Sequence, residues 1–102
     1  TEHTGVDFEA AVGDPVYAAR GGKVSEVGQD GSRGKYLRID HEGGVETGYG
    51  NLSATSLQPG DCVTPGQEIG KAGLTGHAPG PQLHFEVWRD GKAVDPLQLL
   101  PD

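Results

Sequence analysis

The sequence has 102 residues and a formal net charge of −7, with 8 Lys and Arg against 15 Asp and Glu. This length predicts one domain with a small core, spanning residues 1–102. The negative charge argues against binding to nucleic acid or to an anionic membrane surface, and no apolar run is long enough to cross a membrane.

Glycine-containing pairs divide the chain into short alternating apolar segments, which is typical of hairpins. The pairs are Gly21-Gly22, Asp30-Gly31, Gly43-Gly44 and Asp90-Gly91. The predicted strands span residues 15–20, 22–28, 35–41, 45–52, 67–71, 82–89 and 92–94. No window of about 11 residues shows helical periodicity, and only residues 96–100 could form a helical turn. We therefore predict an all-β fold.

Cys62 is the single cysteine, so an internal disulfide is excluded. We interpret it as a small residue at the start of a strand.

Three residues could form a metal site. His3 and Asp7 are separated by three residues that include Gly5, which we expect to let the backbone bend so that imidazole and carboxylate converge. His84 occupies a polar position of an alternating strand. Zinc accepts such ligands, and a catalytic zinc keeps three protein ligands and a water. Each signal alone is weak, because a surface His–Asp pair or a hydrogen-bonded strand histidine is an ordinary feature.

Four segments, in order, resemble the lysostaphin/LytM family of zinc metallopeptidases. They are HTGVDFEAAVGDPVYAARGGKVSEVG, IDHEGGVETGYGNLS, LQPGDCVTPGQEIGKAGLTG and GPQLHFEVWRDGKAVDPLQLL, and they cover nearly the whole chain. The resemblance implies a small antiparallel two-sheet β domain with a metal-centred groove, one zinc ion, and action on bacterial peptidoglycan outside the cytoplasm. Because family members usually have another strand before the first ligand, we expect residues 1–102 to be a fragment of a longer chain.

The same resemblance assigns a role to each candidate residue. The family's zinc ligands correspond to His3, Asp7 and His84, whereas its two proton-transfer histidines correspond to Asn51 and Gln82. Gln82 shares a strand face with His84, about 7 Å away, and could contact a metal-held water. An amide cannot accept a proton at neutral pH, and losing a general base lowers rates by about 10²–10⁴. Asn51 could still stabilise an oxyanion as a donor.

Three other polar residues have alternative interpretations. His77 lies just before the metal strand and could substitute for a missing histidine, although lining of the groove or exposure to solvent is the simpler role. His41, at a strand end, is interpreted as structural. Glu86 either supports His84 from behind or is exposed to solvent.

Three function hypotheses remain open. The first is a degenerate domain that keeps the zinc site and binds peptidoglycan peptides or a cell-envelope protein as a wall-binding or regulatory module. The second is an active zinc metalloendopeptidase that cleaves peptidoglycan cross-links. The third is a carrier-like barrel without metal, because QPGDCVTPGQEIG is similar to a loop of biotinyl and lipoyl carriers, but Lys71 and Lys92 lack the flanking pattern of a modified lysine. The Asn51/Gln82 pair favours the first hypothesis.

Overall fold

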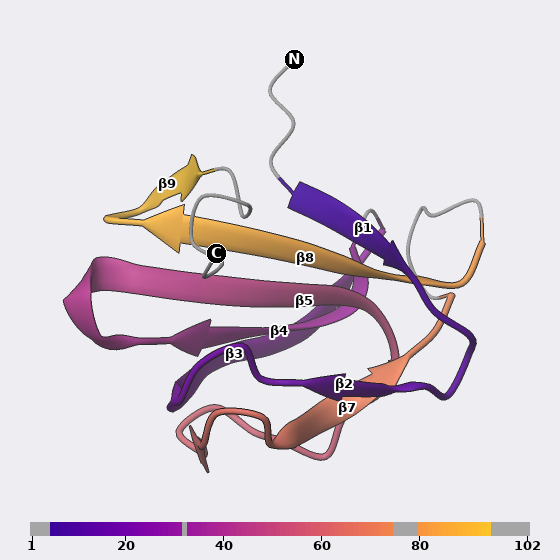
Figure 1. Ribbon diagram of the computed structural model, residues 1–102, viewed down its shortest axis with the longest axis horizontal. Coiled ribbons are helices and arrows are strands. Elements are labelled where there is room, and N and C mark those ends of the chain that lie inside the picture. Colours follow the sequence, from indigo (N-terminus) through magenta and orange to yellow (C-terminus); the bar gives the residue numbers. More distant parts are fainter. Residues whose placement is uncertain (1–4, 32, 75–79, 95–102) are drawn as a thin grey trace.

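The computed structural model describes residues 5–31, 33–74 and 80–94, and nearly all of these residues lie in or between antiparallel strands (Figure 1). The strands are β1 (Gly5–Glu9), β2 (Pro15–Tyr17), β3 (Gly22–Asp30), β4 (Gly34–Asp40), β5 (Val45–Ala54), β6 (Cys62–Val63), β7 (Glu68–Ala72), β8 (Gln82–Arg89) and β9 (Lys92–Val94). The helical structure in this part of the chain is the short 3-10 turn Glu42–Gly44, and no helix there is long and apolar enough to cross a membrane. The predicted all-β class is confirmed.

The strands form one curled sheet in the order β1-β8-β5-β4-β3-β6, with β9 pairing β8 and β2 pairing β7. The long strand β5 joins the parts, because it pairs with β4, β8 and β7. The β2–β7 pair lies below the main strands in Figure 1. The antiparallel arrangement expected from the resemblance is therefore present, and β5 connects the β2–β7 pair to the other strands of the sheet through its pairing with β7.

Strand β1 was not among the strands predicted from the sequence. Its residues pair in regular antiparallel register with β8, from Gly5 opposite Glu86 to Glu9 opposite Gln82. Gly5 is therefore the first residue of a strand and not the bend that its spacing suggested. The short strand β6 begins at Cys62, as the interpretation of that exposed residue predicted. The possible helical turn at 96–100 lies outside the described residues.

Two of the predicted glycine turns adopt the left-handed backbone conformation that glycine favours. Gly43 and Gly44 have φ angles of 79° and 78°, and Asp90 and Gly91 have φ angles of 52° and 82°. These turns connect β4 to β5 and β8 to β9. These two hairpins and the β3–β4 hairpin after Asp30 therefore form where the sequence placed them, whereas the hairpin expected at Gly21-Gly22 is wrong, because β2 pairs with β7 and β3 with β4 and β6.

The core lies on one face of the central strands and leaves the other face polar. Leu37 and Ile39 of β4 have no exposed surface, and Phe85 and Val87 of β8 are buried beside them in the same cluster. The cluster of buried apolar residues comprises Val16, Ala18, Val24, Leu37, Ile39, Val45, Tyr49, Leu52, Val63, Ile69, Ala72, Phe85 and Val87. Because side chains alternate along a strand, the even-numbered positions of β8, including His84, lie on the opposite face.

Candidate functional site

Asp7 and His84 are 77 residues apart in sequence and directly opposite each other in the β1–β8 pair. Partners opposite each other in antiparallel strands present their side chains on the same face. The Oδ1 atom of Asp7 lies 2.6 Å from Nδ1 of His84. Strand register alone therefore brings together two of the three residues predicted to bind metal.

Glu86 contacts the other side of the same imidazole. Its Oε2 atom lies 2.7 Å from Nε2 of His84, and its residue surface is only 9% exposed. The alternative that Glu86 is solvent-exposed is wrong, because this contact and the neighbouring strands bury it. Histidine ligands of metals commonly donate their second ring N–H to a carboxylate in this way.

The two carboxylates change the protonation of His84. The hydrogen bond to Glu86 raises the pKa of His84 to about 9, against the opposing effect of burial, and the bond to Asp7 adds to the rise. In this arrangement the imidazole is charged at neutral pH and donates an N–H to each carboxylate. A metal ligand must be neutral, so a metal ion at this position would replace one of the two protons.

The chemistry of the donor set fits zinc, which takes imidazole nitrogen and carboxylate oxygen. Asp7 is at Nδ1 of His84, and Glu86 is at the opposite ring nitrogen, where a supporting carboxylate is normally found. Because these carboxylates are on opposite sides of the ring, they do not converge on one point. Accordingly, the described residues contain no group of three His, Cys, Asp or Glu side chains that could hold a metal. The expected third ligand, His3, lies outside them.

Asn51 connects three segments of the fold from a buried position. Its backbone has a φ angle of 63°, and its residue surface is 2% exposed. Its Nδ2 atom donates to the carbonyl oxygens of Gly73, at 2.8 Å, and Gln82, at 2.7 Å. Both amide hydrogens are thus used by the backbone, so donation to an oxyanion would require one of these bonds to break.

Gln82 is the first residue of β8 and is partly buried. It lies two residues before His84 on the same strand face, as its position in the sequence predicted. His77 lies outside the described residues. The structural interpretation of His41 is supported by its burial and by its contacts, which are Gly21 O at 2.7 Å and Thr47 Oγ1 at 2.8 Å.

A shallow hollow next to His84, too small to enclose a water molecule, was not predicted from the sequence. Its lining includes Arg33, Tyr36, Gly50, Glu86 and Trp88 besides His84 itself. The side chains of Arg33 and His84 flank Gly50, because a Cβ atom on Gly50 would lie 3.5 Å from the Cβ atom of each. A signal was present in the sequence, since glycines at positions 48 and 50 interrupt one face of a predicted strand.

Residues 1–96 match the family model described as Peptidase family M23. The chain belongs to peptidase family M23. A solved structure titled as a zinc containing peptidase from Vibrio cholerae is 39% identical, has a TM-score of 0.89, and matches over 98% of this chain and 30% of that one. The catalytic domain of lysostaphin from Staphylococcus simulans is 34% identical, with a TM-score of 0.86 over 94% of this chain and 77% of that domain.

Among curated M23 relatives, the peptidoglycan DD-endopeptidase ShyB of Vibrio cholerae is 40% identical over 96 residues, which is 94% of this chain and 22% of that protein. The chain therefore spans about a fifth of the length of this relative. The family resemblance seen in the sequence and the lysostaphin-like fold are confirmed.

Proposed function

We propose that this chain is a peptidoglycan-directed M23 domain that binds zinc through His3, Asp7 and His84 but hydrolyses peptide bonds poorly. It would act outside the cytoplasm as a wall-binding or regulatory module. The observation that carries the proposal is the contact of His84 with Asp7 and Glu86 beside Asn51 and Gln82, two side chains that cannot take up a proton.

Two comparisons support the choice of substrate and metal. One relative is named as a peptidoglycan endopeptidase, and one structural neighbour is described as containing zinc. When bound in such a site, zinc supplies Lewis-acid chemistry that activates water and polarises a carbonyl group. The residues of this chain would hold the ion, and Glu86 would fix the orientation of the His84 ring.

Impaired hydrolysis is inferred from the side chains at the site, because neither Gln82 nor Asn51 can accept a proton from a water molecule. Gln82 can orient a water by hydrogen bonding but cannot accept its proton. Asn51 has already committed both amide hydrogens to backbone carbonyls. The alternative function is an active zinc metalloendopeptidase that cleaves peptidoglycan cross-links, with another group, such as His77, taking over proton transfer.

Zinc binding is tested by calorimetric titration of the chelator-stripped protein. We expect one ion per chain, and we expect His84→Ala and Asp7→Asn each to abolish binding. Glu9→Gln is a matched control, because Glu9 is an exposed carboxylate two residues from Asp7 on the same strand face. Absence of binding to the unaltered protein, or equal loss in the Glu9→Gln variant, would contradict the assigned ligands.

Hydrolysis is tested with purified peptidoglycan and added zinc. We expect the unaltered protein to co-sediment with the insoluble wall without releasing soluble fragments, and the Asn51→His/Gln82→His double variant to gain release. Circular dichroism checks that the double variant is folded. Equal release by both proteins would establish the active-enzyme alternative, and failure to co-sediment would count against a peptidoglycan-directed role.

A further inference from the structure

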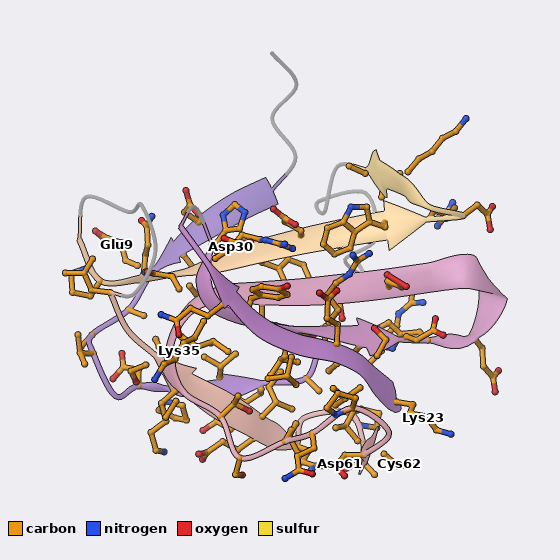
Figure 2. The ribbon with its side chains drawn as sticks, turned by 180° about the vertical axis from the view of Figure 1, so that it is seen from behind. Glu9, Lys23, Asp30, Lys35, Asp61 and Cys62 are labelled. Atoms are coloured by element: carbon orange, nitrogen blue, oxygen red, sulfur yellow. The ribbon has the colours of Figure 1, made fainter. Side chains whose placement is uncertain are left out.

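Arg33 stands at the edge of the hollow that contains His84, on the opposite side of Gly50. It follows the turn at the end of β3 and comes just before β4. Figure 2 shows Asp30, the last residue of β3, near the end of the molecule where Glu9 lies, and Lys23 of the same strand at the opposite end. The β3–β4 turn therefore carries Arg33 to the same end of the molecule as β1 and the start of β8.

The guanidinium of Arg33 is held on one face and along one edge. Its Cζ atom lies 4.0 Å from the centre of the Tyr36 ring, which is a stacked arrangement. Its Nε and Nη2 atoms lie 3.0 Å and 2.9 Å from Oδ2 of Asp30, whose other oxygen accepts the Arg33 backbone N–H at 2.6 Å. These contacts fix the side chain before any ligand arrives, which lowers the entropy cost of binding.

One edge of this guanidinium is left to bind something else. Among the described residues, the guanidinium contacts of Arg33 are made through Nε, Nη2 and the face of the group and none through Nη1, and the side chain is 29% exposed. The Nη1 and Nη2 atoms together present two parallel N–H groups, the fork that binds a carboxylate through two bonds. A lysine could not replace this geometry.

Arg38 lines the same hollow, but both of its terminal nitrogens, Nη1 and Nη2, already lie near carboxylates. It also lies over an aromatic ring, 4.1 Å from the centre of Trp88. Its Nη2 atom is paired with Glu46 and its Nη1 atom lies 3.8 Å from Glu26, whereas its Nε atom is buried without a hydrogen-bond partner among the described residues. Two carboxylates therefore already share the charge of Arg38, whereas Arg33 has one.

We propose that Arg33 is a substrate-positioning residue that binds a carboxylate group of the cell-wall peptide at its solvent-exposed guanidinium edge, beside His84. This proposal rests on the proposed function and specifies which chemical group of the peptide the site selects. The carboxylate would contact the free edge of the guanidinium, while Asp30 and Tyr36 hold that edge in place.

The test compares two synthetic peptides that differ at one group. Both end in D-alanine; one carries a free C-terminal carboxylate as its only carboxylate, and the other is its C-terminal amide. Dissociation constants are measured by NMR titration in chelator, so that carboxylate binding by a metal ion does not contribute. We expect the unaltered protein to bind the carboxylate form about tenfold more tightly, as for a hydrogen-bonded charged pair.

The variants then assign the preference to one residue. Arg33→Gln should bring the ratio of the two dissociation constants close to one, and Arg33→Lys should recover only part of it. Arg38→Lys, the matched control, should keep the full preference. Equal binding of both peptides by the unaltered protein, or equal loss of preference in the Arg38→Lys variant, overturns the inference.

The outcome also separates this inference from the proposed function. Co-sedimentation with peptidoglycan without any preference for the carboxylate peptide overturns the role of Arg33 alone. Failure to bind either peptide together with failure to co-sediment overturns both.

Discussion

At the scale of single residues, Asn51 combines an unusual backbone conformation with a buried hydrogen-bonding side chain. A φ angle of 63° is unfavourable for most residues, although asparagine tolerates it better than others. The side chain connects β5 to the carbonyl groups of Gly73 and Gln82. The position that resembles a catalytic one is therefore also a structural position in this chain.

Replacing Asn51 should destabilise the fold for two separable reasons. Asn51→Ala removes both side-chain hydrogen bonds to backbone carbonyls and places alanine, which tolerates the left-handed region less well than asparagine, at this φ angle, so we expect a loss of about 2–4 kcal/mol. Asn51→Gly removes the same bonds but accepts the backbone conformation, so its loss should be about 1 kcal/mol smaller. Urea unfolding measures both values. Variants as stable as the unaltered protein would show that these bonds contribute little.

At the scale of elements, strand β5 needs a glycine at position 48, because the ring of Trp88 on the neighbouring strand β8 covers this position. A Cβ atom on Gly48 would lie 2.7 Å and 2.8 Å from two atoms of the Trp88 ring. The Trp88 ring also contacts the guanidinium of Arg38 on β4, so side chains or backbone from β4, β5 and β8 meet at this ring. A side chain at position 48 would have to displace the indole.

We therefore expect Gly48→Ala to cost about 1–3 kcal/mol through overpacking. Trp88 is the single tryptophan of the chain, so its fluorescence reports the displacement directly. Gly31→Ala is a suitable control, because a Cβ atom there would have no neighbour within 4 Å. An unchanged emission spectrum and an unchanged unfolding midpoint in the Gly48→Ala variant would show that the ring adjusts without cost.

At the scale of the whole molecule, two tyrosines link the stability of the fold to alkaline pH. Burial raises the pKa of Tyr49, whose hydroxyl accepts the Ala19 backbone N–H at 3.0 Å. The hydrogen bond that Tyr36 donates to Glu26, 2.7 Å long, raises the pKa of Tyr36. Both phenols therefore hold their protons more tightly in the folded protein than in the unfolded chain.

The sign of this linkage predicts a loss of stability at high pH. The contribution of the two phenols is fully present below the ordinary tyrosine value of about 10 and is lost as the pH rises through their folded values. Tyrosinate absorbance should appear at higher pH in the folded protein than in denaturant. Tyr36→Phe should remove one of the late-titrating groups, and coincident titrations of folded and unfolded protein would refute the linkage.

Much of the fold could be predicted because its signals are local. Alternation of apolar residues and glycine turns marked β3, β4, β5, β8 and β9 to within a few residues. Strand β1 was missed because the segment HTGVD was interpreted as a bent metal-binding loop. Its last residues form a strand that pairs with β8, and this pairing has no local signal in the sequence. Short-range patterns specify extended structure, whereas the partner of an edge strand depends on the whole sheet.

The sequence by itself determined the all-β class, three of the four predicted hairpin turns, and the kinds of side chain available for a metal site. Only the tertiary structure decided that Asp7 and Glu86 contact opposite nitrogens of His84, that Asn51 is committed to the backbone, and that Arg33 lies beside His84. The physical reason is register. One step of strand pairing reverses the face of every side chain, and that choice depends on contacts between residues far apart in the chain.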